Sequence, residues 1–204
     1  MSKILDSLYL WLDTETRIND REKKTQNIVW LRCLPFIATH IACLAVFWVG
    51  CSYQSIILCF FSYFIRMFAI TGFYHRFFSH RSFKTSRPMQ LLFGVLGASA
   101  AQRGPIWWSA HHRLHHRHSD HELDPHSPKQ HGFLWSHFMW FMHESNFQTN
   151  KTHINDLCRY PELVFLNRYD TLVPIAYATI LYLVGGWQYV IWGYCISTVI
   201  VYHA

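Results

Sequence analysis

Three long apolar blocks limit the folds open to this chain more than any other feature of its sequence. Residues 34–50 and 172–202 carry no charged side chain, and residues 55–72 carry only Arg66. The first two blocks along the chain each approach the roughly 20 apolar residues that a helix needs to cross a bilayer. The third block is broken near its middle by a Gly-Gly pair, which is typical of a turn between two helices. The sequence therefore predicts an all-α membrane protein with two transmembrane helical hairpins.

Basic residues on both sides of the first hairpin predict its orientation. They are Arg17, Arg21, Lys23, Lys24, Arg32, Arg76, Arg81, Lys84 and Arg87. Because segments rich in Lys and Arg stay on the cytoplasmic side, we expect both ends of the hairpin at residues 34–72 to lie there. We expect residues 73–168 to form a cytoplasmic, helical, His-rich cap and residues 171–204 to form the second hairpin, within one domain of residues 1–204.

The charge and the cysteines argue against two other classes of protein. The formal net charge of +6 lies beside apolar blocks, so its expected counterpart is the anionic lipid surface and not nucleic acid. The six cysteines include no C-x-x-C pair, and most lie in or beside apolar stretches. This usage is typical of buried thiols in a reducing compartment, with neither a disulfide framework nor a thiolate metal site.

Histidine is concentrated in two clusters, both on the expected cytoplasmic side. His75 and His80 follow the second predicted helix, and His112, His115 and His116 lie in a His-dense stretch further along. Positions i, i+3 and i+4 of a helix share a face, so the second cluster can point at a common metal. His75 and His80 diverge by more than a right angle on an ideal α-helix. They could bracket one site or reach two metals, especially if the helix ends between them.

The type of ligand narrows the choice of metal. Imidazoles without thiolates exclude iron-sulfur clusters and argue against calcium or magnesium, which leaves zinc, copper or non-haem iron. A zinc protease needs His-Glu-x-x-His, and the sequence has no such run. Solvated or structurally hydrogen-bonded histidines are the plainer alternative, but that interpretation suits single histidines better than two spaced clusters.

Four motifs resemble those of a known membrane enzyme family. They read G-F-Y-H-R-F-F-S-H-R-S-F-K-T, W-W-S-A-H-H-R-L-H-H-R-H-S-D, D-P-H-S-P and G-F-L-W-S-H-F-M-W. In these four motifs the chain resembles the integral-membrane fatty acyl desaturases of the stearoyl-CoA, delta-9 type. The resemblance implies a four-helix membrane anchor, a cytoplasmic cap and a di-iron centre. His75 and His80 match its first ligand box, and His112, His115 and His116 match the second.

The resemblance also implies a reaction. Such an oxidoreductase uses O2 and two irons to insert a cis double bond into a saturated acyl-CoA or acyl-lipid during unsaturated fatty acid biosynthesis. The electrons come from a ferredoxin, or from cytochrome b5 with its reductase. A related membrane di-iron lipid or alkane hydroxylase, which would form an alcohol, is the alternative within the same chemistry.

The family pattern contains ligands that this sequence does not reach. A third H-x-x-H-H box and one further histidine follow the fourth spanning helix in the family, and the sequence stops at Ala204, with His203 just short of that ligand. We therefore expect a C-terminally incomplete domain. A truncated, inactive membrane protein that binds one metal weakly or none is the remaining hypothesis.

Further residues are candidates for roles around the metals. The resemblance implies that Gln102 and Trp108 line the acyl or head-group path, and Arg103 is a further candidate for contact with the substrate. Positions suited to hydrogen bonds that support the ligand histidines are Asp120, Asp124 and His126, although helix capping or a turn would explain them equally well. A basic rim that could meet an acidic electron carrier or a CoA phosphate consists of Arg81, Lys84, Arg87 and Arg103.

Overall fold

The structure is a computed structural model that describes residues 9, 11–14, 28 and 30–204. Four of the basic residues that predicted the orientation lie outside the described residues: Arg17, Arg21, Lys23 and Lys24. The regular secondary structure of the described residues is helical, and these residues form no strand. They contain an isolated antiparallel bridge between Ile28 and His143. The all-α prediction is confirmed.

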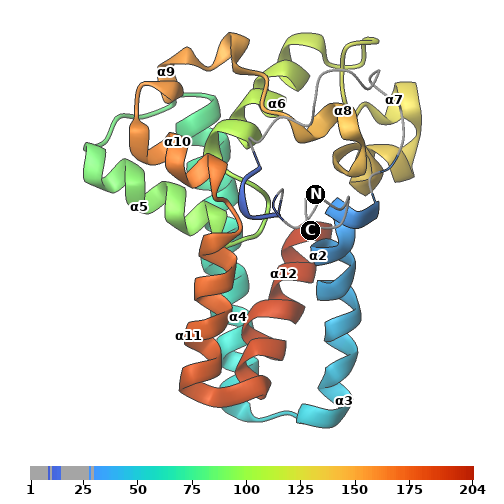
Figure 1. Ribbon diagram of the computed structural model, residues 1–204, viewed down its shortest axis with the longest axis vertical. Helices are drawn as coiled ribbons and strands as arrows, with labels where there is room; N and C mark the ends of the chain where they lie inside the picture. The colour runs from blue at the N-terminus through green and yellow to red at the C-terminus, as the bar shows by residue number, and fades with distance from the viewer. Residues whose placement is uncertain (1–8, 10, 15–27, 29) are drawn as a thin grey trace.

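Long helices form a bundle below a cap of short ones (Figure 1). The bundle contains α2 (Trp30–Ala42), η1 (Cys43–Ala45), α3 (Val46–Val49), α4 (Tyr53–Phe68), η2 (Ala69–Ser79), α11 (Leu172–Tyr189), η6 (Val190–Ile196) and α12 (Ser197–His203). Three stretches are long and apolar enough to cross a membrane: Trp30–Val49, Tyr53–Ser79 and Leu172–His203. The last is interrupted at Gly185 and Gly186, whose backbone is not helical, and the chain reverses there between α11 and α12. The bundle therefore has four antiparallel passes.

The turns of the two hairpins are hydrogen-bonded to each other at the end of the bundle that faces away from the cap. Gly50 has a φ of 68°, and Ser52 caps α4 by accepting a bond from the backbone N of Ser55. The Ser52 hydroxyl lies 2.7 Å from Oε1 of Gln188, whose Nε2 donates to the carbonyl of Val49 at 2.9 Å. These bonds fix the register between the hairpins.

Arg66 is buried inside the bundle, where a charged side chain needs many partners. Its exposed fraction is 2%, and its guanidinium donates to the hydroxyls of Thr198 (2.6 Å) and Ser197. It also donates to three backbone carbonyls: those of Ser62, Ser99 and Gly193. Arg66 thus ties α4 to α12 and η6, and it does not extend to the membrane surface.

The cap is assembled from short helices that pack on the C-terminal end of η2. They are α5 (Arg87–Ala98), α6 (Pro105–His118), α7 (Pro128–His131), η3 (Trp135–Met139), η4 (Trp140–Met142), α8 (Glu144–Phe147), η5 (Lys151–His153), α9 (Asn155–Cys158) and α10 (Pro161–Arg168). Their core includes the fully buried Tyr74, Phe78, Ile106, Leu157 and Leu163. Because this core joins η2 to α6, α9 and α10, it holds the two histidine motifs against each other.

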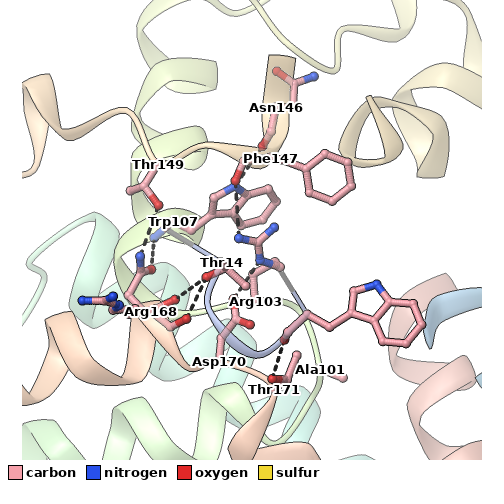
Figure 2. A network of polar contacts seen from close by, with 12 residues as sticks. Thr14, Ala101, Arg103, Trp107, Asn146, Phe147, Thr149, Arg168, Asp170 and Thr171 are labelled. Atoms are coloured by element: carbon pink, nitrogen blue, oxygen red, sulfur yellow. Dashed lines mark hydrogen bonds and ion pairs between the residues drawn. The ribbon is translucent and has the colours of Figure 1, made fainter. Parts of the chain in front are cut away.

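The N-terminal segment at residues 11–14 lies across the junction of cap and bundle (Figure 2). Asp13 accepts two bonds from Arg168 at 2.6 and 2.9 Å, and the Thr14 backbone N donates to the Arg168 carbonyl at 3.0 Å. Thr171 in turn donates its hydroxyl to the carbonyl of Trp11 at 2.7 Å. The segment is thereby fixed to the linker between α10 and α11.

A row of three histidines joins the bundle to the cap. Nε2 of His40 in α2 lies 2.9 Å from Nε2 of His203 in α12, and Nδ1 of His203 lies 2.9 Å from Nε2 of His137 in η3. Nδ1 of His40 lies 2.8 Å from the carbonyl of Phe36, which can only accept a hydrogen bond. Neutral tautomers can therefore satisfy the whole row, with each ring donating to the next. His203, which the sequence analysis did not assign as a ligand, is part of this row.

Candidate metal centre and adjoining cavity

His75 and His80 converge because the helix that carries them is not an α-helix. Residues Ala69–Ser79 form a π-helix, and the backbone N of His80 closes an i→i+5 bond to the carbonyl of His75 at 3.1 Å. In this geometry residues five apart lie one above the other. The two Nε2 atoms are 3.1 Å apart. The divergence expected from an ideal α-helix is therefore absent, and the two rings face one site.

Helix α6 adds two imidazoles to this pair. His112 and His116, one turn apart, face η2, and Nε2 of His112 lies 3.0 Å from Nε2 of His80. One nitrogen from each of the four rings lies within 4.8 Å of every other. Four imidazole nitrogens at this spacing suit a single transition-metal ion of the borderline or non-haem iron type. The structure thus brings together four of the five histidines proposed as ligands.

His115 lies apart from the other four, in a group with Asp124 and His126. Its Nδ1 is 2.9 Å from both carboxylate oxygens of Asp124, and its ring stacks on that of His126 with centroids 4.2 Å apart. Consecutive residues of an α-helix are turned by about 100°, so His115 and His116 face different directions. The expectation that His112, His115 and His116 share one metal region is therefore corrected: α6 faces two neighbouring sites, the second of which could also hold a metal.

Of the three residues expected to support the candidate ligands, two contact one of them, His115. Asp124 is buried, and its carboxylate also accepts bonds from the backbone N of Asp120 (3.1 Å) and His126 (3.2 Å). Asp120 contacts no ligand ring. It has a φ of 64° and accepts the hydroxyl of Ser127, so it shapes the turn that holds Asp124.

Burial lowers the pKa of three histidines in and beside the candidate metal centre, His112, His116 and His126. Burial lowers the pKa of His112 to about 3, and the neighbouring imidazoles of His75 and His116 act in the same direction. Burial lowers the pKa of His116 and His126 for the same reason. Burial opposes ionisation of Asp124, but the hydrogen bond from His115 and two backbone bonds outweigh it and lower its pKa. A neutral imidazole beside an ionised carboxylate is the form that binds a metal.

Trp108 connects the four-histidine group to a cavity of about 580 Å3. Its indole stacks on the ring of His112, with centroids 4.7 Å apart and planes at 23°, and it also contacts His75 and Tyr74. The cavity is lined mainly by aromatic and aliphatic side chains that include Trp107, Trp140, Phe141 and Tyr202 alongside Trp108. It is of the size and character that ligand pockets usually have.

Four polar residues that line the cavity lie close together around the loop before α6 (Figure 2): Thr14, Arg103, Asp170 and Thr171. Ala101 and Arg103 have φ values of 57° and 71°, a left-handed conformation that costs energy for residues other than glycine. Arg103 donates Nε to Asp170 at 2.7 Å and Nη2 to the Phe147 carbonyl at 3.3 Å. All three residues expected to contact substrate, Gln102, Arg103 and Trp108, line this cavity.

The expected basic rim does not form as a free surface. Arg81 pairs with Asp156 at 2.6 Å, Arg87 with Glu162 at 2.7 Å and Arg103 with Asp170 at 2.7 Å. These three carboxylates come from α9, α10 and the segment after α10, so the sequence around the arginines gave no sign of them. The rim prediction is corrected to three ion pairs and the exposed Lys84.

Two residues around the site, Arg113 and Arg32, were missed by sequence reasoning. Arg113, between two ligand candidates, donates to the carbonyls of Phe78 and Ser79, at the end of the helix that carries the first histidines. Arg32 lines the cavity, where its guanidinium lies 4.8 Å from the ring centre of Phe147. The position of Arg113 inside the histidine motif was the one available signal, whereas nothing in the sequence links Arg32 to the site.

Comparison with known proteins gives one family. The family model described as "Fatty acid desaturase" matches residues 52–204. An sn-2 palmitoyl-lipid 9-desaturase of Nostoc sp. (strain 36) is 38% identical over 136 residues, which cover 64% of this chain and 47% of that protein. An sn-1 stearoyl-lipid 9-desaturase of Anabaena variabilis is 35% identical over 86% of this chain and 65% of its own length. An acyl-CoA C20 Delta5-desaturase of Anemone leveillei is 33% identical over 89% of this chain and 62% of its own length. The chain thus spans about half to two thirds of the length of these relatives.

Proposed function

The chain belongs to the fatty acid desaturase family, and from that premise we propose that the full-length protein is an O2-dependent di-iron desaturase of fatty acyl chains. It would insert a cis double bond into a saturated chain as a step of unsaturated fatty acid biosynthesis. One observation carries the proposal. Four imidazoles converge within 4.8 Å, and Trp108, which stacks on one of them, also lines a largely apolar cavity.

The donor atoms on the two sides of α6 fit non-haem iron. His75, His80, His112 and His116 would hold one ion, and His115 would contribute to a second. Asp124 engages Nδ1 of His115, which leaves Nε2 of that ring as the unprotonated ligand atom. A bound iron pair would supply the O2 activation and one-electron chemistry that amino-acid side chains lack.

The protein's own part in the reaction is positioning and exclusion of water. The apolar lining of the cavity would hold a saturated chain, with Trp108 setting its approach to the ligand histidines. Arg32, Gln102 and Arg103 would receive the polar head of the substrate. Because the C–H bonds of such a chain are nearly equivalent, the position of the new double bond would follow from how far the chain runs past the histidines.

The substrate and partners follow from the family and its named members. Two of the relatives are named as lipid 9-desaturases and one as an acyl-CoA desaturase, so we propose an acyl-lipid or acyl-CoA substrate and a delta-9 product. A ferredoxin, or cytochrome b5 with its reductase, would supply the electrons. The Lys and Arg residues that flank the first hairpin support a cytoplasmic position for both histidine motifs.

Product analysis of the full-length protein tests the proposal. It would be expressed in a host that lacks desaturases, and the fatty acids would be analysed by gas chromatography and mass spectrometry for the number and position of double bonds. We expect new cis-monounsaturated chains, which disappear in His80→Ala and His112→Ala. His121→Ala is the matched control, because His121 lies in the same His-rich stretch and is exposed.

Two outcomes would contradict the proposal. Hydroxylated chains without new double bonds would assign the protein to the related hydroxylases. Purified full-length protein that contains no iron and forms no product would leave an inactive membrane protein as the remaining interpretation.

A further inference from the structure

Arg113 links the two histidine motifs through the backbone of the first one. Its Nε donates to the carbonyl of Ser79 at 3.0 Å and its Nη2 to the carbonyl of Phe78 at 2.8 Å. These carbonyls end helix η2, where helical partners run out, and they immediately precede His80. Since Arg113 directly follows His112 in α6, its guanidinium sets the distance between the chain at His80 and the chain at His112.

Asp156 in α9 holds this guanidinium and a second one. Its two oxygens accept bonds from Nη1 and Nη2 of Arg113 at 2.9 and 3.0 Å, in the two-pronged geometry that suits an arginine-carboxylate pair. The same carboxylate accepts bonds from Nε and Nη2 of Arg81 at 2.8 and 2.6 Å. Arg81 directly follows His80, so one carboxylate bridges the residues that follow two ligand candidates.

The arrangement needs such a bridge for two reasons. Arg81 has a φ of 54°, a left-handed conformation that an arginine keeps only when its surroundings hold it. In addition, Nε2 of His80 and Nε2 of His112 come from segments 32 residues apart and are only 3.0 Å from each other. A metal centre tolerates positional errors of about half an ångström, so its ligands need support from neighbouring groups.

We propose that Asp156 is a positioning residue that fixes the spacing of His80 and His112 by bridging Arg81 and Arg113. The inference rests on the proposed function, because it treats these histidines as metal ligands. Asp156 touches neither ring and acts only through the two arginines. Its removal would leave the histidines present but less well placed, with weaker iron binding and a changed ligand field.

Glu162 provides a matched control on the same cap. Its carboxylate accepts two bonds from Arg87 at 2.7 and 2.8 Å, and the two residues are 75 positions apart, as Arg81 and Asp156 are. Arg87 begins α5 and is not a neighbour of a ligand histidine in the sequence. An effect that comes from losing any surface ion pair should therefore be seen in both Glu162→Gln and Asp156→Asn. An effect that comes from misplaced histidines should be seen only in Asp156→Asn.

The experiment compares four full-length proteins in detergent: wild type, Asp156→Asn, Asp156→Glu and Glu162→Gln. Iron would be removed and Fe(II) titrated back, with affinity, stoichiometry and the near-infrared circular dichroism of the bound Fe(II) recorded. We expect Asp156→Asn to bind iron about tenfold to a hundredfold more weakly with an altered spectrum. Glu162→Gln should match wild type, and Asp156→Glu should recover much of the affinity.

Hydrogen exchange of the iron-free proteins gives a second readout that does not depend on the metal. We expect faster exchange of the peptide that contains Phe78 to Ser82 in Asp156→Asn and not in Glu162→Gln. Wild-type affinity and spectrum in Asp156→Asn would overturn the inference while leaving the proposed function intact. Failure of the wild-type protein to take up iron would instead contradict the proposed function. In that case hydrogen exchange still tests the inference: an unchanged exchange rate in Asp156→Asn would show that Asp156 does not hold the chain at His80 in place.

Discussion

Nδ1 of His115 lies 2.9 Å from both carboxylate oxygens of Asp124, a residue that is 1% exposed. A buried carboxylate in this position fixes the ring's tautomer and orientation, and it makes the opposite nitrogen a better ligand. Because Asp124 also accepts two backbone bonds from its own turn, it is held as firmly as the ring that it supports. In the second candidate site, the His115 ring is thus held by a carboxylate that its own turn fixes in place.

Asp124→Asn should weaken iron binding at the site of His115 and leave iron binding at the four-histidine site unchanged. An asparagine keeps the size but has one acceptor oxygen in place of two and no charge, so we expect about tenfold to a hundredfold weaker binding of one iron per protein. Metal analysis of full-length protein after dialysis at graded iron concentrations measures this. Asp120→Asn is the control, because Asp120 contacts no ligand ring. Equal iron retention in both variants would contradict the supporting role of Asp124.

Arg66→Met should destabilise the membrane bundle. It removes the hydrogen-bond donors of the Ser197 and Thr198 hydroxyls and of three carbonyls, and Arg66 is buried inside the bundle. We expect a loss of about 2–4 kcal/mol in the free energy of unfolding, measured by denaturation in mild detergent. The exposed Arg159 supplies the control variant Arg159→Met, which should stay within about 0.5 kcal/mol of wild type. A similar small change in Arg66→Met would show that the buried bonds add no stability.

The sequence predicted those features that depend on short-range periodicity. Apolar length predicted the membrane passes, and the i, i+4 spacing of His112 and His116 predicted their shared face. It failed to predict the convergence of His75 and His80, because a π-helix has no distinct signature in composition. The ion pair of Arg81 with Asp156 was missed for another reason: the partner is 75 residues away, and only the packed cap brings it near.

Gly97→Ala should disrupt the packing beneath the site. A Cβ at Gly97 would overlap the ring of Tyr74, which is fully buried and whose hydroxyl lies 3.3 Å from the carbonyls of Gly94 and Arg103. We expect a loss of at least about 1–3 kcal/mol in stability, because neither the ring nor the backbone has room to move. Gly72→Ala is the control, since its Cβ would lie 3.3 Å from the Phe68 ring, which is exposed and can shift. Equal melting temperatures for the two variants would be evidence against this tight contact.

Acid should remove the stabilising effect of Asp156. Partial burial raises the pKa of this carboxyl group, but hydrogen bonds from Arg113 and Arg81 outweigh the burial and hold the pKa at about 2. Its pKa in an unfolded chain is about 4. A depressed pKa contributes stability above the unfolded value, and the contribution is lost as the pH falls from about 4 toward 2. The difference in melting temperature between wild type and Asp156→Asn should thus be full at pH 6 and shrink below pH 4. A difference that grows in acid would contradict this assignment.

Trp108 lies between the candidate metal centre and the cavity. Its substitution should therefore lower the rate of the reaction without lowering the iron content. The indole covers His112 at 4.7 Å between ring centres and also lines the cavity. In Trp108→Ala a bound acyl chain would have space to move relative to the histidines. Because a displacement of about 1 Å can cost a hundredfold in rate, we expect kcat to fall at least about tenfold and double bonds to form at more than one position. Iron content should change little, since the nitrogens of the four proposed ligand histidines remain. Trp108→Phe should retain one product position, and Trp187→Ala, at an exposed residue beside the distal turn, should behave as wild type. A single product position at the wild-type rate in Trp108→Ala would mean that the acyl chain does not approach the histidines along this wall.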